Sequence, residues 1–128
     1  MDSQANDILV VDDNDTILTL VTEVARNSGY SVRTARNAQE FFDAFDEHKP
    51  ALMLVDIVMP DMDGLELIQK LSEISCKIPL VIMSGYNYVD DKGAKLLTKN
   101  LNFTRFLHKP FDVDELEQLF RDSLQAAH

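Results

Sequence analysis

The sequence has a single cysteine, Cys76, and only 12 basic residues against 22 acidic ones. One thiol cannot form an internal disulfide, which excludes a disulfide-stapled scaffold. The formal net charge of -10 makes nucleic acid and anionic membrane surfaces poor direct partners, because both would repel the chain. We therefore expect no direct contact with nucleic acid or membrane. Cations and basic protein surfaces suit this charge better.

Long hydrophobic runs are also missing. No apolar stretch approaches the ~20 residues that a membrane-spanning helix needs. Residues 1–7 have neither the basic region nor the apolar region of a secretory signal, so we expect a cytoplasmic protein. No internal repeat, linker or low-complexity segment is present. With 45% hydrophobic residues among 128, the chain can bury a real core, and we expect one domain over residues 1–128.

Short apolar segments alternate with segments of helical spacing along the chain. The expected strands are Ile8–Val11, Tyr30–Ala35, Ala51–Val55, Leu80–Met83 and Phe103–His108. The expected helices run from Asp15 to a stop at Gly29, from the cap Asn37 through Phe45, over Leu65–Leu71, from about Asp90 to Lys99, and after the cap Asp112. This pattern predicts an α/β fold, a doubly wound five-stranded parallel sheet in the order 2-1-3-4-5 with five helices on its two faces.

Polar side chains follow four of the five expected strands. Asp12 and Asp13 come after the first strand, Asp56 after the third, Ser84 after the fourth and Lys109 after the fifth. In a doubly wound sheet, ligands bind beyond the carboxyl ends of the strands, where the strand order reverses. We therefore expect three carboxylates, a hydroxyl and an amine to meet at one edge of the sheet.

Such a set of groups indicates a metal-assisted phosphoryl site. Three neighbouring carboxylates repel one another unless a cation intervenes, and Mg²⁺ favours one or two carboxylates together with water and phosphate oxygens. A divalent ion and Lys109 would balance the charge of the three aspartates. A carboxylate can act as a nucleophile on phosphorus while the cations neutralise the phosphoryl oxygens.

The same residues resemble the receiver domain of two-component response regulators, over nearly the whole chain. The resemblance rests on the acidic pair Asp12-Asp13, on Asp56 with Met59-Pro60 and Gly64 after it, on Ser84-Gly85, and on Lys109-Pro110-Phe111. It implies a flavodoxin-like receiver fold and a role in phosphorelay signal transduction. It also implies that the chain catalyses only its own phosphorylation and dephosphorylation, so we do not expect an enzyme in any other sense.

The resemblance assigns a role to each site residue. Asp56 is implied as the phosphoacceptor, and Asp13, Asp56 and the backbone carbonyl of Val58 as direct Mg²⁺ ligands, with Asp12 acting through water. Ser84 is implied to move toward the phosphoryl group, Lys109 to pair with it, and Phe106 to follow Ser84 as a switch. We also expect a cis peptide bond between Lys109 and Pro110, because X-Pro bonds tolerate cis at a cost of ~0.5 to 1 kcal/mol.

The implied partners are a histidine kinase or histidine phosphotransfer protein as donor and a downstream protein that the sequence does not identify. The signalling surface would lie around the helix expected near Asp90–Lys99, the strand Phe103–His108 and the last helix. The chain ends close to that helix, so we expect no effector domain in residues 1–128. The sequence leaves open whether the chain also forms a homodimer.

Other interpretations compete with this one. Asp12, Asp13 and Asp15 could simply cap the first helix, which is the commoner role of acids at that position. Asp13 and Asp15 also have the D-x-D spacing of a haloacid-dehalogenase-like phosphatase, although the chain lacks a cap domain. A receiver-like adaptor that signals without phosphorylation is a further alternative, and a flavodoxin-like FMN carrier fits less well because no Ser/Thr-rich phosphate loop follows the first strand.

Overall fold

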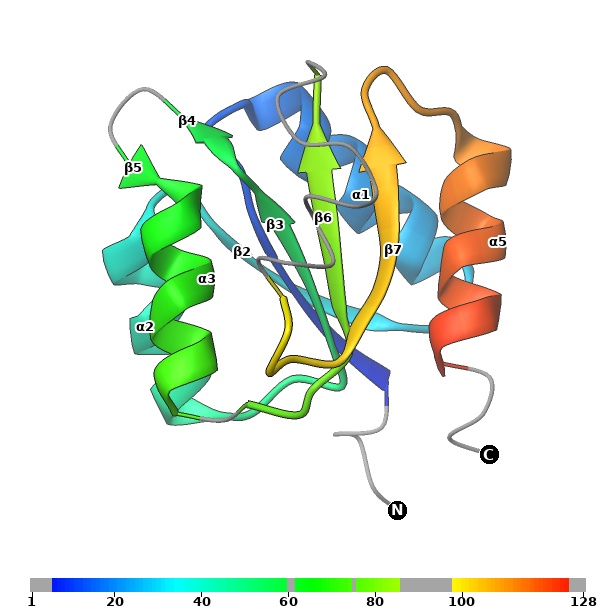
Figure 1. The fold of residues 1–128 in the computed structure, drawn as a ribbon. Helices are drawn as coiled ribbons and strands as arrows, with labels where there is room; N and C mark the ends of the chain where they lie inside the picture. The colour runs from blue at the N-terminus through cyan, green and yellow to red at the C-terminus, as the bar shows by residue number, and fades with distance from the viewer. Residues whose placement is uncertain (1–5, 60–61, 75, 86–97, 125–128) are drawn as a thin grey trace.

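The computed structural model describes residues 6–59, 62–74, 76–85 and 98–124 of the chain. Among them, eleven elements follow one another (Figure 1). In chain order these are β1 (Asp7–Val11), α1 (Asp15–Asn27), β2 (Ser31–Ala35), α2 (Ala38–Glu47), β3 (Leu52–Asp56), β4 (Val58–Met59), β5 (Met62–Asp63), α3 (Gly64–Glu73), β6 (Leu80–Ser84), β7 (Phe103–His108) and α5 (Val113–Leu124).

The main sheet has five strands in the order β2-β1-β3-β6-β7, and all four neighbouring pairs are parallel. Counting these strands from one to five along the chain gives the predicted order 2-1-3-4-5, which is confirmed. Because the strands are parallel, their carboxyl ends lie at one edge, toward which the arrowheads of β3, β6 and β7 point in Figure 1. The strand order reverses between β1 and β3 at that edge.

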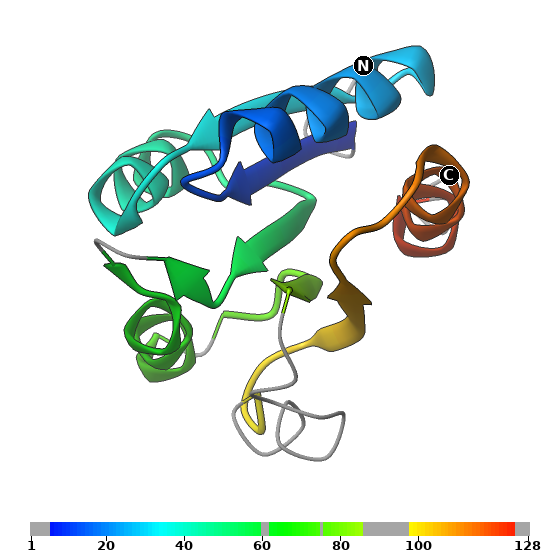
Figure 2. The same cartoon turned by 90° about the horizontal axis from the view of Figure 1, so that it is seen from above.

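Helices cover both faces of the sheet, α1 and α5 on one and α2 and α3 on the other (Figures 1 and 2). Successive side chains of a strand point to opposite faces, so each central strand contributes to two separate cores. Ile8 and Val10 of β1 pack with residues of α1 and α5, whereas Leu9 and Val11 pack with residues of α2 and α3. This two-sided burial explains why the central strands are continuous apolar runs.

Local signals fix the ends of several helices as the sequence predicts. Gly29 follows α1 with a φ of 90°, a left-handed conformation that glycine adopts without steric cost. At the start of α5, the Glu115 amide donates to Asp112 Oδ1 at 2.9 Å, and the Asp112 amide donates to Glu115 Oε1 at 3.3 Å. This reciprocal pair is a capping box, in which Asp112 is the predicted cap.

The structure also contains a short element that the sequence did not predict. Met62–Asp63 pairs antiparallel with Val58–Met59 as a hairpin, β4-β5, just beyond β3. The helix expected near Asp90–Lys99 lies almost entirely outside the described residues, and its last positions, 98 and 99, belong to a turn. The described residues therefore contain four α-helices where the whole chain was expected to have five. None of these four is long and apolar enough to cross a membrane.

Candidate functional site

The carboxyl edge of the sheet brings together most of the residues that the sequence singled out. Asp12 directly follows β1, Asp56 is the last residue of β3, Ser84 ends β6 and Lys109 directly follows β7. Asp12, Asp56 and Ser84 are buried, with at most 1% of each residue exposed. A buried carboxylate requires a partner, since leaving it unpaired away from water costs several kcal/mol.

Lys109 supplies that partner. Its Nζ atom lies 2.6 Å from Asp12 Oδ2 and 3.1 Å from Asp56 Oδ2, so one ammonium bridges two buried carboxylates from different strands. Burial by itself lowers the pKa of Lys109, but the hydrogen bonds and charges of Asp12 and Asp56 outweigh it, and the pKa is raised above its ordinary value of 10.5. Lys109 is therefore fully protonated at neutral pH.

The remaining charge of the cluster favours a cation. Asp12, Asp13 and Asp56 each place a carboxylate oxygen within 4.8 Å of the other two, and Asp13 is exposed at the mouth of the group. Three carboxylates and one ammonium leave two negative charges uncompensated. Oxygen-only ligands beside an open approach fit Mg²⁺, which keeps several waters or phosphate oxygens in its coordination shell.

The alternative that these acids merely cap α1 does not describe the structure. Asn14 is the N-cap residue, and its Oδ1 atom accepts from the amides of Thr16 at 2.8 Å and Ile17 at 3.3 Å. Asp12 instead accepts from the Asn14 amide through Oδ1, at 2.9 Å, and from Lys109 through Oδ2. Asp15 is exposed and pairs with Arg36 at 2.7 Å. Capping by Asn14 leaves Asp12 and Asp13 available to the site.

The predicted switch residues lie on neighbouring strands. Ser84 pairs in register with His108, and its carbonyl oxygen accepts from the Lys109 amide at 2.8 Å. Phe106 is half-buried and packs against the core on the α2 and α3 side of the sheet. The peptide bond between Lys109 and Pro110 is cis, which confirms that prediction. Val58 lies in β4, two residues after Asp56, and the role of its carbonyl as a ligand stays a prediction.

Sequence reasoning missed a third buried acid, Asp7, at the opposite edge of the sheet. Arg33 Nη2 lies 2.7 Å from Asp7 Oδ2, and the same guanidinium donates to the carbonyls of Ala44 and His48 at 2.6 and 2.5 Å. The arginine thus ties β1 and β2 to the C-terminal end of α2. This role is structural, and the only sequence signal for it is an arginine in the middle of a strand.

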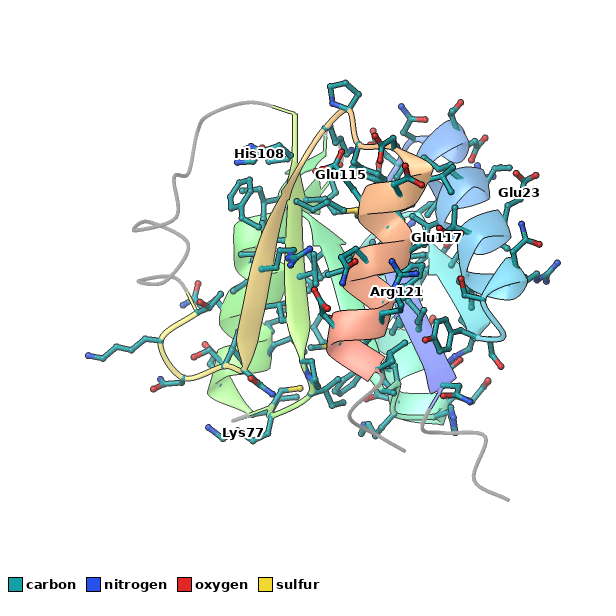
Figure 3. All side chains as sticks on the ribbon, turned by 90° about the vertical axis from the view of Figure 1, so that its right-hand side faces the viewer. Glu23, Lys77, His108, Glu115, Glu117 and Arg121 are labelled. Atoms are coloured by element: carbon teal, nitrogen blue, oxygen red, sulfur yellow. The ribbon has the colours of Figure 1, made fainter. Side chains whose placement is uncertain are left out.

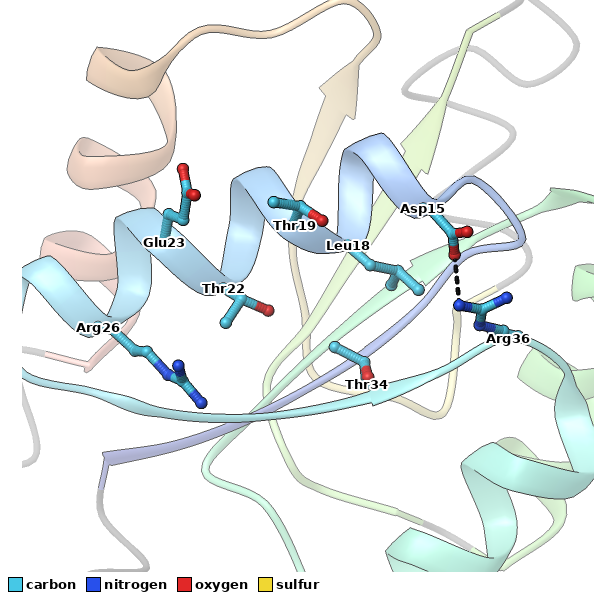
Figure 4. A pocket seen from close by; sticks show the side chains of 8 residues that line it. All are labelled: Asp15, Leu18, Thr19, Thr22, Glu23, Arg26, Thr34 and Arg36. Atoms are coloured by element: carbon cyan, nitrogen blue, oxygen red, sulfur yellow. Dashed lines mark ion pairs between the residues drawn. The ribbon is translucent and has the colours of Figure 1, made fainter.

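An open groove of about 570 Å³ lies between α1 and β2 (Figure 4). Threonines, arginines and acids line it, and the Asp15–Arg36 ion pair stands at one end. None of Asp12, Asp13, Asp56, Ser84 and Lys109 contributes to its lining. This groove is therefore separate from the charged cluster, where the chemical groups converge.

Known proteins share this fold and its sequence pattern. The model of the response regulator receiver domain family matches residues 8–121 of the chain. The chain belongs to that family. Membership as a receiver domain sets aside the dehalogenase-like phosphatase and the FMN carrier as descriptions of the fold, and it supports a place in two-component phosphorelay.

Curated relatives differ in how much of their length the receiver domain spans. This chain is 32% identical over 117 residues to sporulation initiation phosphotransferase F of Bacillus subtilis, and the match covers 91% of this chain and 92% of that protein. It is 36% identical over 120 residues to response regulator Rre1 of Synechocystis sp., covering 91% of this chain but only 51% of that protein. The chain is also 33% identical over 124 residues to the transcriptional regulatory protein ZraR of Klebsiella oxytoca, covering 97% of this chain but only 27% of that protein.

Solved structures agree with the fold. The receiver domain of NtrX from Brucella abortus superimposes with a TM-score of 0.80 at 30% identity, covering 93% of this chain and 98% of that chain. A CheY-like receiver domain protein from Methanospirillum hungatei gives a TM-score of 0.80 at 26% identity, covering 94% of both chains. The predicted receiver fold is thus confirmed.

Proposed function

We propose that the receiver domain accepts a phosphoryl group on Asp56, in a magnesium-dependent reaction, from a phosphohistidine of a histidine kinase or histidine phosphotransfer protein. The observation that carries the proposal is the Lys109 ammonium held between Asp12 and Asp56 beside a third carboxylate, Asp13. A cation next to a buried carboxylate is the arrangement that phosphoryl transfer to an acid needs, because negative charge on the phosphoryl oxygens must be neutralised.

The choice of Asp56 over Asp12 follows from the contacts of Asp12 and from the position of Asp56 in the sheet. Asp12 uses both carboxylate oxygens, one toward the Asn14 amide and one toward Lys109, which leaves it poorly placed as a nucleophile. Asp56 ends β3 at the point where the strand order reverses. In the transfer, an Asp56 oxygen forms a bond to phosphorus as the P–N bond to the donor imidazole breaks. The imidazole keeps the electron pair and takes up a proton.

The chain's own residues would hold the metal and orient the phosphoryl group. Asp13, Asp56 and the Val58 carbonyl would be direct Mg²⁺ ligands, and Asp12 would act through water. When bound, Mg²⁺ would neutralise charge on the phosphoryl oxygens. Lys109 would exchange its hydrogen bond to Asp56 for one to a phosphoryl oxygen, and it is fully protonated for that task because its pKa is raised.

The output would be a change of packing. Phosphorylation adds about one negative charge at Asp56, which would draw the Ser84 hydroxyl and Lys109 toward the new oxygens. The space that Ser84 leaves would let Phe106 turn inward. Surfaces around β7, α5 and the segment before β7 would then present a different face to a downstream protein. The receiver domain would act only on its own Asp56 and would not turn over small phosphate esters.

Phosphorylation in vitro tests this function. Incubation with Mg²⁺ and acetyl phosphate should add one phosphoryl group, which intact-mass spectrometry would detect and peptide mapping would place on Asp56. An Asp56→Asn variant should lose the label almost completely, and chelation of Mg²⁺ should abolish it in the wild type.

Asp15→Asn is the matched control, because it removes an exposed carboxylate two residues beyond Asp13 that pairs with Arg36 rather than with Lys109. It should label like the wild type. Equal labelling of the Asp56→Asn variant would exclude Asp56 as the acceptor. A complete lack of label in the wild type would favour the adaptor that signals without phosphorylation, and steady hydrolysis of p-nitrophenyl phosphate would indicate a phosphatase.

A further inference from the structure

A second aromatic ring lies against Phe106. The ring centroids of Phe106 and His108 are 4.6 Å apart, and the ring planes are inclined at 34°. The two residues are two positions apart on β7, so their side chains point to the same face of the sheet. Figure 3 shows His108 on the side of β7 that faces away from α5, in agreement with the packing of Phe106 against the core on the α2 and α3 side.

The strand register places His108 beside the other proposed switch residue as well. Across the β6-β7 pair, Ser84 is in register with His108, and Ile82 is in register with Phe106. The Lys109 amide, next in the chain, donates to the Ser84 carbonyl. His108 therefore neighbours Ser84 across the sheet and contacts Phe106 along the strand, so a movement of either residue changes its surroundings.

His108 packs against a phenyl ring that is only partly buried. Phe106 is half-buried while His108 is exposed, so the imidazole covers part of a ring that would otherwise meet water. Phe106 has no hydroxyl, and its position is set by packing alone. An aromatic pair adds a favourable contribution beyond the buried area, and a ring that turned into the core would give it up.

We infer that His108 is a positioning residue that holds Phe106 in its surface position and thereby opposes the phosphorylated packing. The inference rests on the proposed function, since it requires that phosphorylation favours the inward ring. Coupling between two events is reciprocal. A contact that stabilises the surface position must weaken binding of a phosphoryl group or its mimic at Asp56 by the same factor, and removing the contact must strengthen that binding.

Beryllofluoride affinity in the presence of Mg²⁺ measures this coupling. Replacing His108 by alanine should tighten binding roughly two- to tenfold, the factor that one aromatic pair supplies. The aromatic substitution His108→Phe should restore an affinity close to that of the wild type. His48→Ala makes the same chemical change in the loop after α2 and should leave the affinity unaltered. Circular dichroism would verify that each variant is folded.

A double-mutant cycle separates a positioning role from a direct effect of the imidazole on the site. In a Phe106→Leu background, His108→Ala should no longer change the affinity, because the ring through which it acts is gone. A wild type that fails to bind beryllofluoride would refute the proposed function itself. A wild type that binds normally, with His108→Ala binding equally or more weakly, would refute only the role of His108. Tightening that persists without Phe106 would also refute it.

Discussion

Lys109 is the residue on which the candidate site depends most. Its ammonium pairs with Asp12 and Asp56, both buried, and its side chain is only 18% exposed. Two buried carboxylates from different strands would be strongly destabilising without it. The same contacts that prepare a phosphoryl site therefore hold the ends of β1, β3 and β7 together in the unphosphorylated protein.

Replacing Lys109 by methionine should lower the free energy of unfolding by about 3 kcal/mol, the low end for breaking a buried pair, because the ammonium is partly accessible. Urea denaturation in the presence of a chelator would measure this. Lys77→Met removes an exposed lysine whose ammonium donates to the Asn100 carbonyl, and it should change stability by less than about 0.5 kcal/mol. Equal effects of the two substitutions would mean that the Lys109 bridge contributes nothing.

The raised pKa of Lys109 determines how the stability difference between the wild type and Lys109→Met depends on pH. The unfolded chain has a lysine of ordinary pKa, 10.5, and the folded protein binds the proton more tightly. The stabilisation is therefore fully present below pH 10.5 and is lost as the pH rises through the higher folded value. The stability difference between wild type and Lys109→Met should stay constant from pH 7 to about 9 and narrow only above pH 10.5. Narrowing that begins near neutrality would contradict this assignment.

At the scale of single elements, neighbouring residues in the loop between β1 and α1 have different roles. Asn14 caps the helix, Asp12 turns back to Lys109, and Asp13 points to the exposed side of the cluster. The sequence left open whether the acids cap the helix, because aspartate and asparagine are equally good caps and four such residues stand in a row. The direction of each side chain determines which residue caps α1, and the spacing of the residues in the sequence does not specify that direction.

The cap itself is testable. Asn14→Ala should cost about 1 kcal/mol of stability, since two amides in the first turn of α1 lose their acceptor, and Asn14→Ser should recover most of the loss. Thr19→Ala lies at an exposed position within the same helix and should not destabilise the protein, because alanine has the higher helix propensity. Chemical denaturation would measure all three. A destabilisation by Thr19→Ala as large as that by Asn14→Ala would show that the cap has no special role.

Other element boundaries show where local rules suffice. At α5, Asp112 and Glu115 each accept a hydrogen bond from the other's amide. At α2, the Glu40 carboxylate instead accepts from the Arg36 amide at 2.9 Å, one residue before the Asn37 cap. The hairpin β4-β5 was not predicted, because two-residue strands carry no periodicity that could reveal them. Strong caps and apolar runs thus predict elements, whereas short irregular segments do not.

At the scale of the whole molecule, topology was the most predictable feature. Five apolar runs with helices between them require a parallel sheet, and the carboxyl edge of such a sheet gathers the residues that follow each strand. Contacts that depend on the direction of individual side chains were not predictable. The ion pair of Asp7 with Arg33 and the ring contact of Phe106 with His108 are examples. The order of strands and helices in the sequence determines which residues meet at the carboxyl edge of the sheet. Side-chain packing in the folded protein determines which atoms are in contact.

The carboxylate cluster also links metal binding to the stability of the whole domain. Its uncompensated charge disfavours the folded state, in which Asp12, Asp13 and Asp56 lie close together, relative to the unfolded chain, in which they separate. An ion that binds only the folded state stabilises it by mass action, by about 2.7 kcal/mol at a hundredfold excess over Kd. For a domain of this size, the melting temperature should rise by roughly 10 °C. Calorimetry across a magnesium titration at constant ionic strength would measure the shift.

Asp13→Asn distinguishes binding at this cluster from general screening of the net charge of -10. Without magnesium, the variant should melt above the wild type, because one of three like charges is removed. With magnesium, it should lose most of the shift, because an exposed ligand is gone. Asp43→Asn makes the same charge change on the exposed side of α2 and should keep the full shift, since its partner Gln39 still finds an acceptor. Similar shifts in the wild type and both variants would mean that magnesium acts through bulk electrostatics, and a flat titration of the wild type would exclude a magnesium site at this edge of the sheet.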